Sequence, residues 1–336
     1  MAERSNWTPL HAQLHRTLRS RHLLARNQRL LVAVSGGQDS LCLIKLLLDL
    51  QPLWEWQLGI AHCDHRWRPD SEANANHVEQ LAKTWETSFY GYTAEQTLKS
   101  EAEGRQWRYQ ALGAIAEENG YNCIVTGHTA SDRAETLVYN LMRGSGADGL
   151  QALTWRRRLS SGLALVRPLL EITRVETAQF CQDMQLTVWE DSTNQDLKYA
   201  RNRIRQELLP YLQTHFNPEV EHALAQTAEI LQAEVEYLEQ AAHQLKQQAM
   251  PQPKYESPLQ VNRRVLQTAP LALQRRVMRQ VLQQTLAISA PSFEQIEKLT
   301  ALITAHNRSR TDPFPGNAIA EVDGDWITFR MLPIPS

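Results

Sequence analysis

The chain has 336 residues, of which 42% are hydrophobic, and a formal net charge of −2. A chain of this length buries enough apolar surface for two modest cores, so we expect two domains. The near-neutral charge excludes a uniformly basic nucleic-acid binder, and any surface for a polyanion must therefore be local.

The cysteines and the hydrophobic runs indicate a cytoplasmic protein. No CxxC pair occurs, and each cysteine lies in an apolar strand or helix pattern, as reduced core residues do. The N-terminal residues lack a continuous apolar region, and no run reaches the length of a membrane span. We therefore expect no export and no membrane partner. The cysteines are Cys42, Cys63, Cys123 and Cys181.

The first strong motif lies between a predicted strand and a predicted helix. After an amphipathic helix expected over 9–24, an apolar run over 30–34 stops at two glycines and continues as a helical pattern over 41–50. Backbone N–H groups at such a helix start attract phosphate, and glycines let it approach the backbone. The spacing matches neither a Walker loop nor GxGxxG. The loop residues that we expect to bind a nucleotide are Ser35, Gly36, Gly37, Gln38, Asp39 and Ser40.

Asp39 adds a requirement to this loop. A carboxylate beside phosphate repels it unless Mg²⁺ lies between them, so Asp39 is a candidate metal ligand. The hydroxyls of Ser35 and Ser40 supply further hydrogen-bond donors. The loop therefore predicts a nucleotide with a metal ion, and the alternative is a glycine turn that only joins a strand to a helix.

The following elements alternate between strand and helix. Strands are expected over 57–64, 88–93 and 122–126, with helices over 71–85 and 101–119 between them. This alternation predicts an α/β fold with a doubly wound parallel sheet, covered on both faces. In such sheets ligands lie at the carboxyl ends of the strands, where the strand order reverses.

Polar and charged clusters follow these strands. We assign His65 and Arg68, after the second strand, to the substrate side of the site. His62 is more simply a polar loop residue, because a zinc site would need further ligands nearby. Arg105 and Arg108 lie three residues apart on one helix face, where they either suit phosphates or are merely solvated.

Two carboxylates begin the helix after the strand 122–126. Asp132 and Glu135 are three residues apart and so share a face. They either complement the helix dipole or hold a cationic substrate beside ATP. The glycine-rich segment 144–149 is a flexible loop over the site or a helix stop, and another helix is expected over 171–184.

The rest of the chain predicts a basic helix, a connector and a second domain. Arg201 and Arg205 lie one turn apart and suit phosphate contacts with nucleic acid. Apolar residues recur every three or four positions over 218–249 and predict one helix on the order of 45 Å long. Residues 261–310 carry eight Lys or Arg against two acids, an excess typical of a polyanion surface. A hairpin predicted at 318–331 makes this domain α+β.

Three segments follow from this pattern. We expect a catalytic domain over 1–212, a helical linker over 213–250 and a small α+β domain over 251–336. The prolines at 251, 253 and 258 interrupt the helical pattern and mark the entrance of the last segment.

Eight segments occur in order: SGGQDS, HCDHRWR, EGRQWRY, TGHTASDRAET, RGSGADGL, RPLL, WEDSTNQD and RNRIRQELLP. Over about residues 28–212 they resemble the tRNA(Ile)-lysidine synthetases, PP-loop enzymes of the N-type ATP pyrophosphatase group. The resemblance implies a fold like that of the adenine nucleotide alpha hydrolases, with ATP and Mg²⁺ as cofactors. It also implies that O2 of the wobble cytidine of tRNA(Ile) with a CAU anticodon is adenylated, which activates C2, and that L-lysine is then joined to C2. AMP and pyrophosphate are released, and decoding changes from AUG to AUA.

The resemblance also suggests roles for single residues. Asp39 would act with the metal, Asp132 and Glu135 would hold or deprotonate the lysine, and His128 would assist them. The basic second domain would hold the tRNA body. The residues that would steady phosphates or the tRNA are Arg105, Arg108, Arg201 and Arg205, with His65 and Arg68 beside the substrate.

Three alternatives remain. A tRNA thiolase would need a cysteine pair or cluster ligands, which the cysteine spacing does not supply. An amide synthetase for a small molecule would not need a basic second domain. A nucleotide sensor without catalysis would not need three carboxylates close to polyphosphate. The sequence also leaves open whether the chain forms a homodimer.

Overall fold

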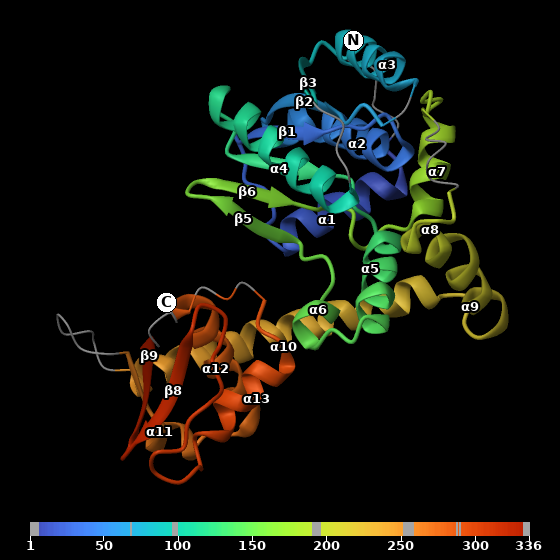
Figure 1. Ribbon diagram of the computed structural model, residues 1–336. Coiled ribbons are helices and arrows are strands. Elements are labelled where there is room, and N and C mark those ends of the chain that lie inside the picture. The colour runs from blue at the N-terminus through green and yellow to red at the C-terminus, as the bar shows by residue number, and fades with distance from the viewer. Residues whose placement is uncertain are drawn as a thin grey trace. The chain divides into compact units, whose positions relative to one another are not determined.

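A six-stranded sheet organises the first part of the chain, seen in a computed structural model that describes residues 7–67, 69–95, 100–189, 196–250, 259–286, 288 and 290–331. The chain divides into two compact units, Met1–Gln232 and Ala233–Ser336. The first unit contains the sheet and the helices that cover it, and the second contains a smaller sheet (Figure 1).

The large sheet has the strand order β3-β2-β1-β4-β6-β5. Every neighbouring pair is parallel except β5 and β6. The chain moves outward in opposite directions from β1 and β4, so the strand order reverses between these two strands. The strands are β1 (Arg29–Ala33), β2 (Gln57–Asp64), β3 (Ser88–Thr93), β4 (Cys123–Thr126), β5 (Arg156–Ser160) and β6 (Leu163–Val166).

Helices cover both faces of this sheet, which confirms the predicted doubly wound fold. Alternate residues of β1 enter two cores: Leu30 and Val32 pack with α1, α2 and α7, whereas Leu31 packs with α4. The helices are α1 (Pro9–Ser20), α2 (Gln38–Trp54), α3 (Ser71–Thr84), α4 (Glu101–Glu118), α5 (Ala130–Met142), α6 (Ala147–Leu150), α7 (Arg174–Asp183), α8 (Ala200–Arg203), η2 (Ile204–Leu208) and α9 (Leu209–His215).

Four features differ from the prediction, the first being that the helix expected over 9–24 ends at Ser20. The hairpin β5–β6 was not predicted, because an arginine-rich run disguises the outer strand. The helix expected from residue 171 begins at Arg174, since Thr173 caps it in a reciprocal pair with Glu176. The basic helix around Arg201 is divided by the π-helical turn η2.

The second unit is α+β, as predicted. The predicted long helix is confirmed as α10 (Val220–Ala249); its first residues belong to the first unit and the rest to the second. The predicted C-terminal hairpin is also confirmed, with Gly324 in its turn at φ +58°. The elements that follow α10 are β7 (Gln260–Asn262), α11 (Arg263–Gln267), α12 (Leu271–Thr285), α13 (Phe293–Ala301), β8 (Ala318–Asp323) and β9 (Trp326–Met331).

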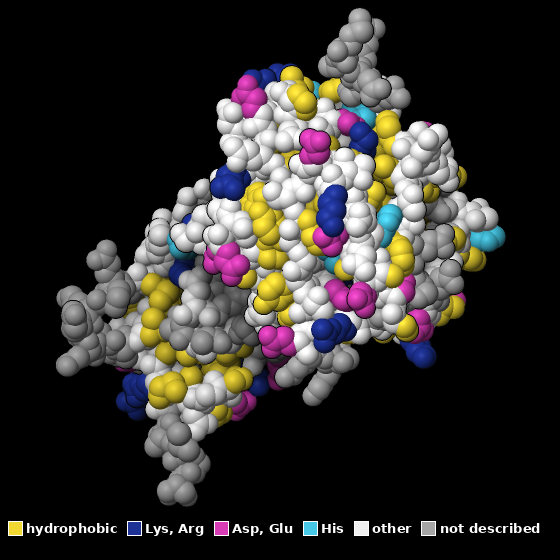
Figure 2. Space-filling model, turned by 90° about the horizontal axis from the view of Figure 1, so that it is seen from above, with side chains coloured by type: hydrophobic (Ala, Val, Ile, Leu, Met, Phe, Trp, Pro, Cys, Tyr) yellow, Lys and Arg dark blue, Asp and Glu magenta, His cyan; other side chains and the backbone are white. Residues whose placement is uncertain are grey.

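The surface charge is mixed. On the face drawn in Figure 2, the coloured basic and acidic side chains are interspersed, in keeping with the net charge of −2. None of the described helices is both long enough and apolar enough to cross a membrane.

Candidate active site

The glycine–serine loop lies where the strand order reverses. It connects β1 to α2, and the loop after β4 packs directly against it. A Cβ on Gly127 would lie 2.7 Å from the backbone oxygen of Asp39, so only glycine allows this approach. Gly36 has φ +90°, and a Cβ there would lie 2.2 Å from Oδ1 of Asn74. Gly127 thus lets the β4 loop pack on the predicted phosphate loop, and Gly36 lets Asn74 of α3 approach the same loop.

Hydrogen bonds within the loop fix its shape. The Ser40 hydroxyl donates to the Gly37 carbonyl at 2.8 Å and accepts from the Ser35 N–H at 3.1 Å. Asn74 of α3 donates to the Ser35 carbonyl at 2.9 Å. Within the described residues, no side chain caps the N-terminus of α2. The first N–H groups of this helix are therefore available to an anion.

Asp39 is held by α7. Nε of Arg174 donates to Oδ2 of Asp39 at 3.0 Å, and the Thr177 hydroxyl donates to Oδ1. Burial raises the pKa of Asp39, although Arg174 and Thr177 favour the charged form. The Gln38 amide also faces α7, where it donates to the Arg174 carbonyl at 2.8 Å. Gln38 therefore positions the helix that holds Asp39.

Asp132 and Glu135 of α5 face the same guanidinium. Nη2 of Arg174 lies 3.2 Å from Oδ1 of Asp132, and its Nη1 lies 3.7 Å from Oε1 of Glu135. Arg205 binds Glu135 through two bonds, Nε to Oε1 at 2.6 Å and Nη2 to Oε2 at 2.9 Å. Two arginines and three carboxylates thus form one network, which we call the carboxylate–arginine network: Asp39, Asp132, Glu135, Arg174 and Arg205.

Two of these carboxyl groups have opposite pKa shifts. Burial raises the pKa of Glu135, even though Arg205 opposes the shift. Burial acts in the same direction on Asp132, but Arg174, His128 and the Thr129 N–H outweigh it and lower the pKa of Asp132. Asp132 therefore stays charged more readily, while Glu135 takes up a proton more readily.

His128 lies among positive charges. Burial lowers its pKa to about 3; the Asp132 carboxylate opposes this shift, and Arg167, Arg108 and Arg105 add to it. Nδ1 of His128 lies 2.9 Å from the Thr126 hydroxyl. The neutral ring can therefore exchange hydrogen bonds but carries no charge near neutral pH.

Arg167, which directly follows β6, is a positively charged residue near His128 that the sequence analysis did not identify. It is 2% exposed, and its Nη1 donates to the Thr154 carbonyl at 2.7 Å. Its Nε has no hydrogen-bond partner in the described part of the chain. Arg105, Arg108 and Arg167 thus form a basic side of the site around His128.

His65 lies within an aromatic group. Its ring stacks on Trp67 with the centroids 5.1 Å apart, and it meets the edge of Trp107 at 4.8 Å. Burial, with a contribution from Arg108, lowers the pKa of His65 to about 4. Arg68 lies outside the described residues. His62 is a buried strand residue whose Nδ1 lies 2.8 Å from the Val34 carbonyl, rather than a loop residue.

The remaining predicted residues have modest roles in the geometry. Arg201 is half-buried on α8, one turn before Arg205. All four cysteines are free; three are buried and Cys63 is half-buried. Burial raises the pKa of Cys63, Cys123 and Cys181 to about 12, so these thiols remain protonated near neutral pH. Among the residues that the structure describes, no three His, Cys, Asp or Glu side chains group as metal ligands.

Arg174 and Thr177 are the site residues that sequence analysis missed. The pattern Thr173-x-x-Glu176 is a capping box, and it would have placed Arg174 at the first position of a helix. It would not have indicated that this helix packs against the phosphate loop. Arg167 is the first residue of the segment RPLL, and no local sequence pattern indicates that its side chain is buried.

An open helix N-terminus behind a glycine–serine loop, with carboxylates converging on it, defines the class as PP-loop enzymes that use ATP. The PP-loop domain family matches residues 8–212, and the TilS substrate binding domain matches residues 262–320. The chain belongs to the tRNA(Ile)-lysidine synthase family.

Similar proteins share nearly the whole length. The tRNA(Ile)-lysidine synthase of Nostoc sp. is 70% identical, with 96% of this chain and 97% of that protein covered. That of Synechocystis sp. is 51% identical, with 96% and 98% covered, and the chloroplastic protein of Zygnema circumcarinatum is 35% identical, with 89% and 81% covered. The solved structure of the U34-tRNA thiolase NcsA from Methanococcus maripaludis has a TM-score of 0.56 at 15% identity. It covers 66% of this chain and 77% of its own, and supports the fold alone.

Proposed function

We propose that the chain joins L-lysine to the wobble cytidine of tRNA(Ile) with a CAU anticodon, as the names of its relatives indicate. In the first step, O2 of cytosine attacks the α-phosphorus of ATP and pyrophosphate leaves. In the second step, the lysine ε-amine attacks C2 and AMP leaves with the former cytosine oxygen. The product is lysidine, which pairs with A, so that the codon read changes from AUG to AUA.

The glycine–serine loop binds the phosphates of ATP. No side chain among the described residues caps the N–H groups at the start of α2, and the Ser40 hydroxyl keeps the loop in shape. Asp39 suits Mg²⁺, which takes one or two protein carboxylates and completes its shell with phosphate oxygens and water. When bound, the ion would neutralise charge that develops on the phosphates. Arg174 and Thr177 of α7 fix the position of the Asp39 carboxylate.

The two carboxylates of α5 receive the lysine side chain. Asp132, whose pKa is lowered, remains charged and attracts the ε-ammonium group. Glu135, whose pKa is raised by burial, is the better acceptor for the proton that the amine must lose before it attacks C2. Arg205 fixes Glu135 through two hydrogen bonds and so positions it. His128, which is neutral, donates or accepts a hydrogen bond near the base.

The tRNA extends beyond this pocket. Arg105 and Arg108 belong to the basic side of the site. Arg201 on α8 lies one turn before Arg205, which lies in η2. His65 and Arg68 belong to the substrate side. We assign 1–212 to catalysis, 213–250 to a linker and 251–336 to tRNA binding, and the match of 262–320 to a substrate binding domain supports the last assignment.

One observation carries this proposal. Asp39, Asp132 and Glu135 come from two different helices and converge on the single guanidinium of Arg174, beside the phosphate loop. Binding of ATP alone does not need three carboxylates, because each of them repels phosphate. A reaction that also binds a cationic amino acid does.

Labelled lysine provides the test. Purified chain, ATP, Mg²⁺, ¹⁴C-lysine and tRNA(Ile) with a CAU anticodon should yield labelled tRNA together with equal amounts of AMP and pyrophosphate. A matched tRNA with uridine at the wobble position should remain unlabelled. Sulfur entering the base, or ATP consumption with any small amide donor, would contradict the proposal.

The thiolase alternative finds little support in the cysteines. Their thiols are buried or half-buried and protonated, as the raised pKa values of Cys63, Cys123 and Cys181 indicate. The loop and the three carboxylates come from one chain, so a homodimer would hold two complete sites. Sedimentation of the active protein measures its oligomeric state directly.

A further inference from the structure

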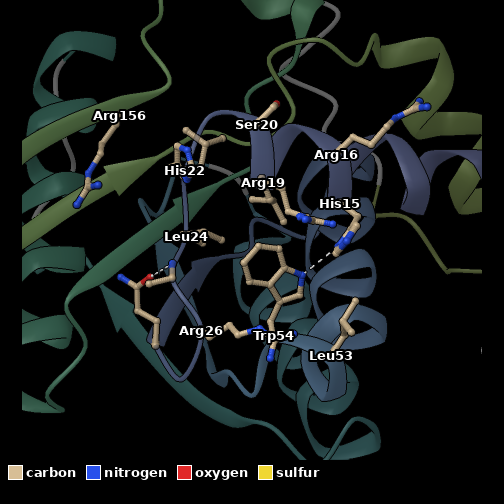
Figure 3. Close-up of a pocket in the computed structure, with 14 residues that line it drawn as sticks. His15, Arg16, Arg19, Ser20, His22, Leu24, Arg26, Leu53, Trp54 and Arg156 are labelled. Atoms are coloured by element: carbon tan, nitrogen blue, oxygen red, sulfur yellow. Dashed lines mark hydrogen bonds between the residues drawn. The ribbon is translucent and has the colours of Figure 1, made fainter.

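A basic pocket lies in the first unit, at the end of α1 and outside the carboxylate–arginine network. Its volume is about 1100 Å³. Figure 3 shows the Trp54 indole in its centre, with His15 and Arg19 of α1 close to the ring, Arg26 beside it and Arg156 on a neighbouring strand. Its apolar floor includes Leu18, Leu23 and Leu24, all buried.

The lining of this pocket has one sign of charge. It includes four arginines and two histidines but no Asp or Glu. Within the described residues, none of these arginines forms an ion pair or a side-chain hydrogen bond, and all four are exposed. By contrast, Arg21, one residue beyond α1, binds both Glu171 and Glu229 at 2.6 Å. The four arginines are Arg16, Arg19, Arg26 and Arg156.

Hydrogen bonds hold the rim of the pocket in place. Trp56 donates through Nε1 to the Ala25 carbonyl at 2.8 Å, and the Asn27 N–H donates to the Trp54 carbonyl at 3.0 Å. Nε1 of Trp54 donates to Nδ1 of His15 at 3.2 Å, which leaves the other ring nitrogen of His15 as a donor. These hydrogen bonds fix the backbone and the aromatic rings of the pocket, around which the four unpaired arginines lie.

The pocket lies well away from the phosphate loop. Asp39 and Trp54 are at opposite ends of α2, and fifteen residues of helix separate them by about 22 Å. A nucleic-acid strand carries one phosphate per roughly 3.4 Å, so this span corresponds to about six nucleotides. A tRNA whose wobble base enters the site reaches such a distance with its anticodon stem.

We propose that this pocket binds the phosphate backbone of the tRNA substrate, outside the anticodon loop. The inference rests on the proposed function, which supplies the tRNA. Exposed arginines from three separate segments suit a chain of spaced phosphates, whereas a single free phosphate is held by a few donors close together. The contacts carry no sequence information, and they set affinity and orientation.

A triple variant tests the proposal. Arg19→Gln, Arg26→Gln and Arg156→Gln together remove three charges from three segments and leave the buried floor intact. We expect the KM for tRNA to rise about tenfold, with the KM for ATP unchanged. The slope of log affinity against log salt should fall by about one per lost contact. The control is Lys83→Gln, which removes one exposed charge from α3, where Lys83 pairs with Glu79.

The outcomes separate this proposal from the function itself. If the unmodified chain transfers no lysine, the proposed function fails, while direct tRNA binding still tests the pocket. If lysine transfer proceeds and the triple variant matches the Lys83→Gln control in KM and salt slope, the pocket does not bind tRNA. Thermal unfolding of the triple variant, expected within a few degrees of the control, checks that it is folded.

A crosslink locates the contact. Ser20 is an exposed pocket residue, and three of the four native cysteines are buried, so Ser20→Cys can carry a photo-crosslinker selectively. We expect crosslinks to paired nucleotides of the tRNA, and fewer with Lys83→Cys. Crosslinks restricted to the anticodon loop, or none above the Lys83→Cys level, would overturn the assignment.

Discussion

Two arginine-rich regions of the first unit differ in what surrounds the guanidinium groups. In the carboxylate–arginine network, Arg174 and Arg205 face three carboxylates within 3.7 Å. In the basic pocket, Arg19, Arg26 and Arg156 have no carboxylate partner in the described residues. Paired arginines orient the groups they bind, whereas unpaired ones project a positive field into solvent. The first arrangement suits chemistry and the second suits a polyanion.

In the second unit, many basic side chains are paired with acids. Its excess of basic residues over 261–310 predicted a polyanion surface, but many of these cations have acidic partners. Arg276 and Arg279 both bind Glu239, Arg264 binds Asp325, and Lys298 lies near Asp312. Glu239, Asp312 and Asp325 lie outside residues 261–310, over which the charges were compared. The net positive charge of residues 261–310 therefore overstates how many of their cations are free to contact a polyanion.

The largest expected effect comes from breaking the network at Asp39. Asp39→Asn keeps the shape of the side chain but removes its charge, so both the pair with Arg174 and the proposed metal ligand are lost. We expect the first step, which releases pyrophosphate, to slow by about 10³-fold. Pyrophosphate release in the presence of tRNA and lysine measures this.

Asp49→Asn is the matched control for that variant. Asp49 lies on the same helix and pairs with Lys45 and His11, away from the phosphate loop. It should keep activity within about threefold, as substitutions outside the site usually do. Full turnover by Asp39→Asn would remove Asp39 from the metal role.

A smaller effect, on stability, is expected when the buried Arg133 loses its acidic partner. Arg133 is 1% exposed and lies 2.7 Å from Glu229, which also accepts hydrogen bonds from Arg21 and Trp155. Glu229→Gln leaves a buried guanidinium without its counter-charge. Because Glu229 is itself one-third exposed, we expect a loss of about 2 kcal/mol in the free energy of unfolding, measured with urea.

Glu234→Gln on the same helix controls for the loss of an acid. Glu234 is exposed, and its replacement should change the free energy of unfolding by less than about 0.5 kcal/mol. Equal stability of the two variants would mean that the charge of Glu229 does not stabilise the buried guanidinium of Arg133. Pairing with a carboxylate would then not be what distinguishes the two arginine-rich regions in energy.

The basic side of the site gives a pH-dependent prediction. The pKa of His128 is about 3 in the folded chain, below the ordinary value of 6.5. The unfolded chain binds more protons between these values, so stability falls as the pH decreases below 6.5 and is unaffected above it. Between pH 6.5 and pH 5.5, His128 should lower the free energy of unfolding by about 1 kcal/mol.

Replacing the ring tests that assignment. His128→Asn should flatten the decrease in unfolding free energy between pH 6.5 and 5, whereas His306→Asn, at an exposed histidine, should leave it unchanged. An unaltered profile in His128→Asn would show that burial and the neighbouring arginines do not suppress protonation of His128.

Much of the fold follows from the sequence, because the first unit is built from local patterns. Strands β1 to β4 and the helices between them were predicted within a few residues, as the apolar runs are long and turns separate them. The hairpin β5–β6 was missed, since exposed arginines on an edge strand hide the β pattern. The end of α1 at Ser20 was also missed, because apolar residues continue to Leu24 and pack without a helix.

The site was predictable only where chemistry and local spacing coincide. Asp39, Asp132 and Glu135 were identified from their positions after strands, and they do converge. Arg174 and Arg167 were missed because their roles depend on packing between segments far apart in the chain. Arg19, Arg26 and Arg156 were missed for the same reason: no window of sequence brings the end of α1 next to β5.

The smallest expected effect extends the comparison to the second unit. Arg275 is paired with Glu297 through bonds of 2.6 and 2.9 Å, yet its side chain is 40% exposed. If the acidic partner is what prevents it from attracting RNA, Glu297→Gln should raise the affinity for tRNA about twofold at low salt. Glu234→Gln, at an exposed acid of α10 that forms no ion pair within the described residues, controls for net charge. The effect should disappear above the salt concentration at which exposed charges are screened. Equal affinities of the two variants at low salt would show that overall charge, rather than a freed guanidinium, determines binding here.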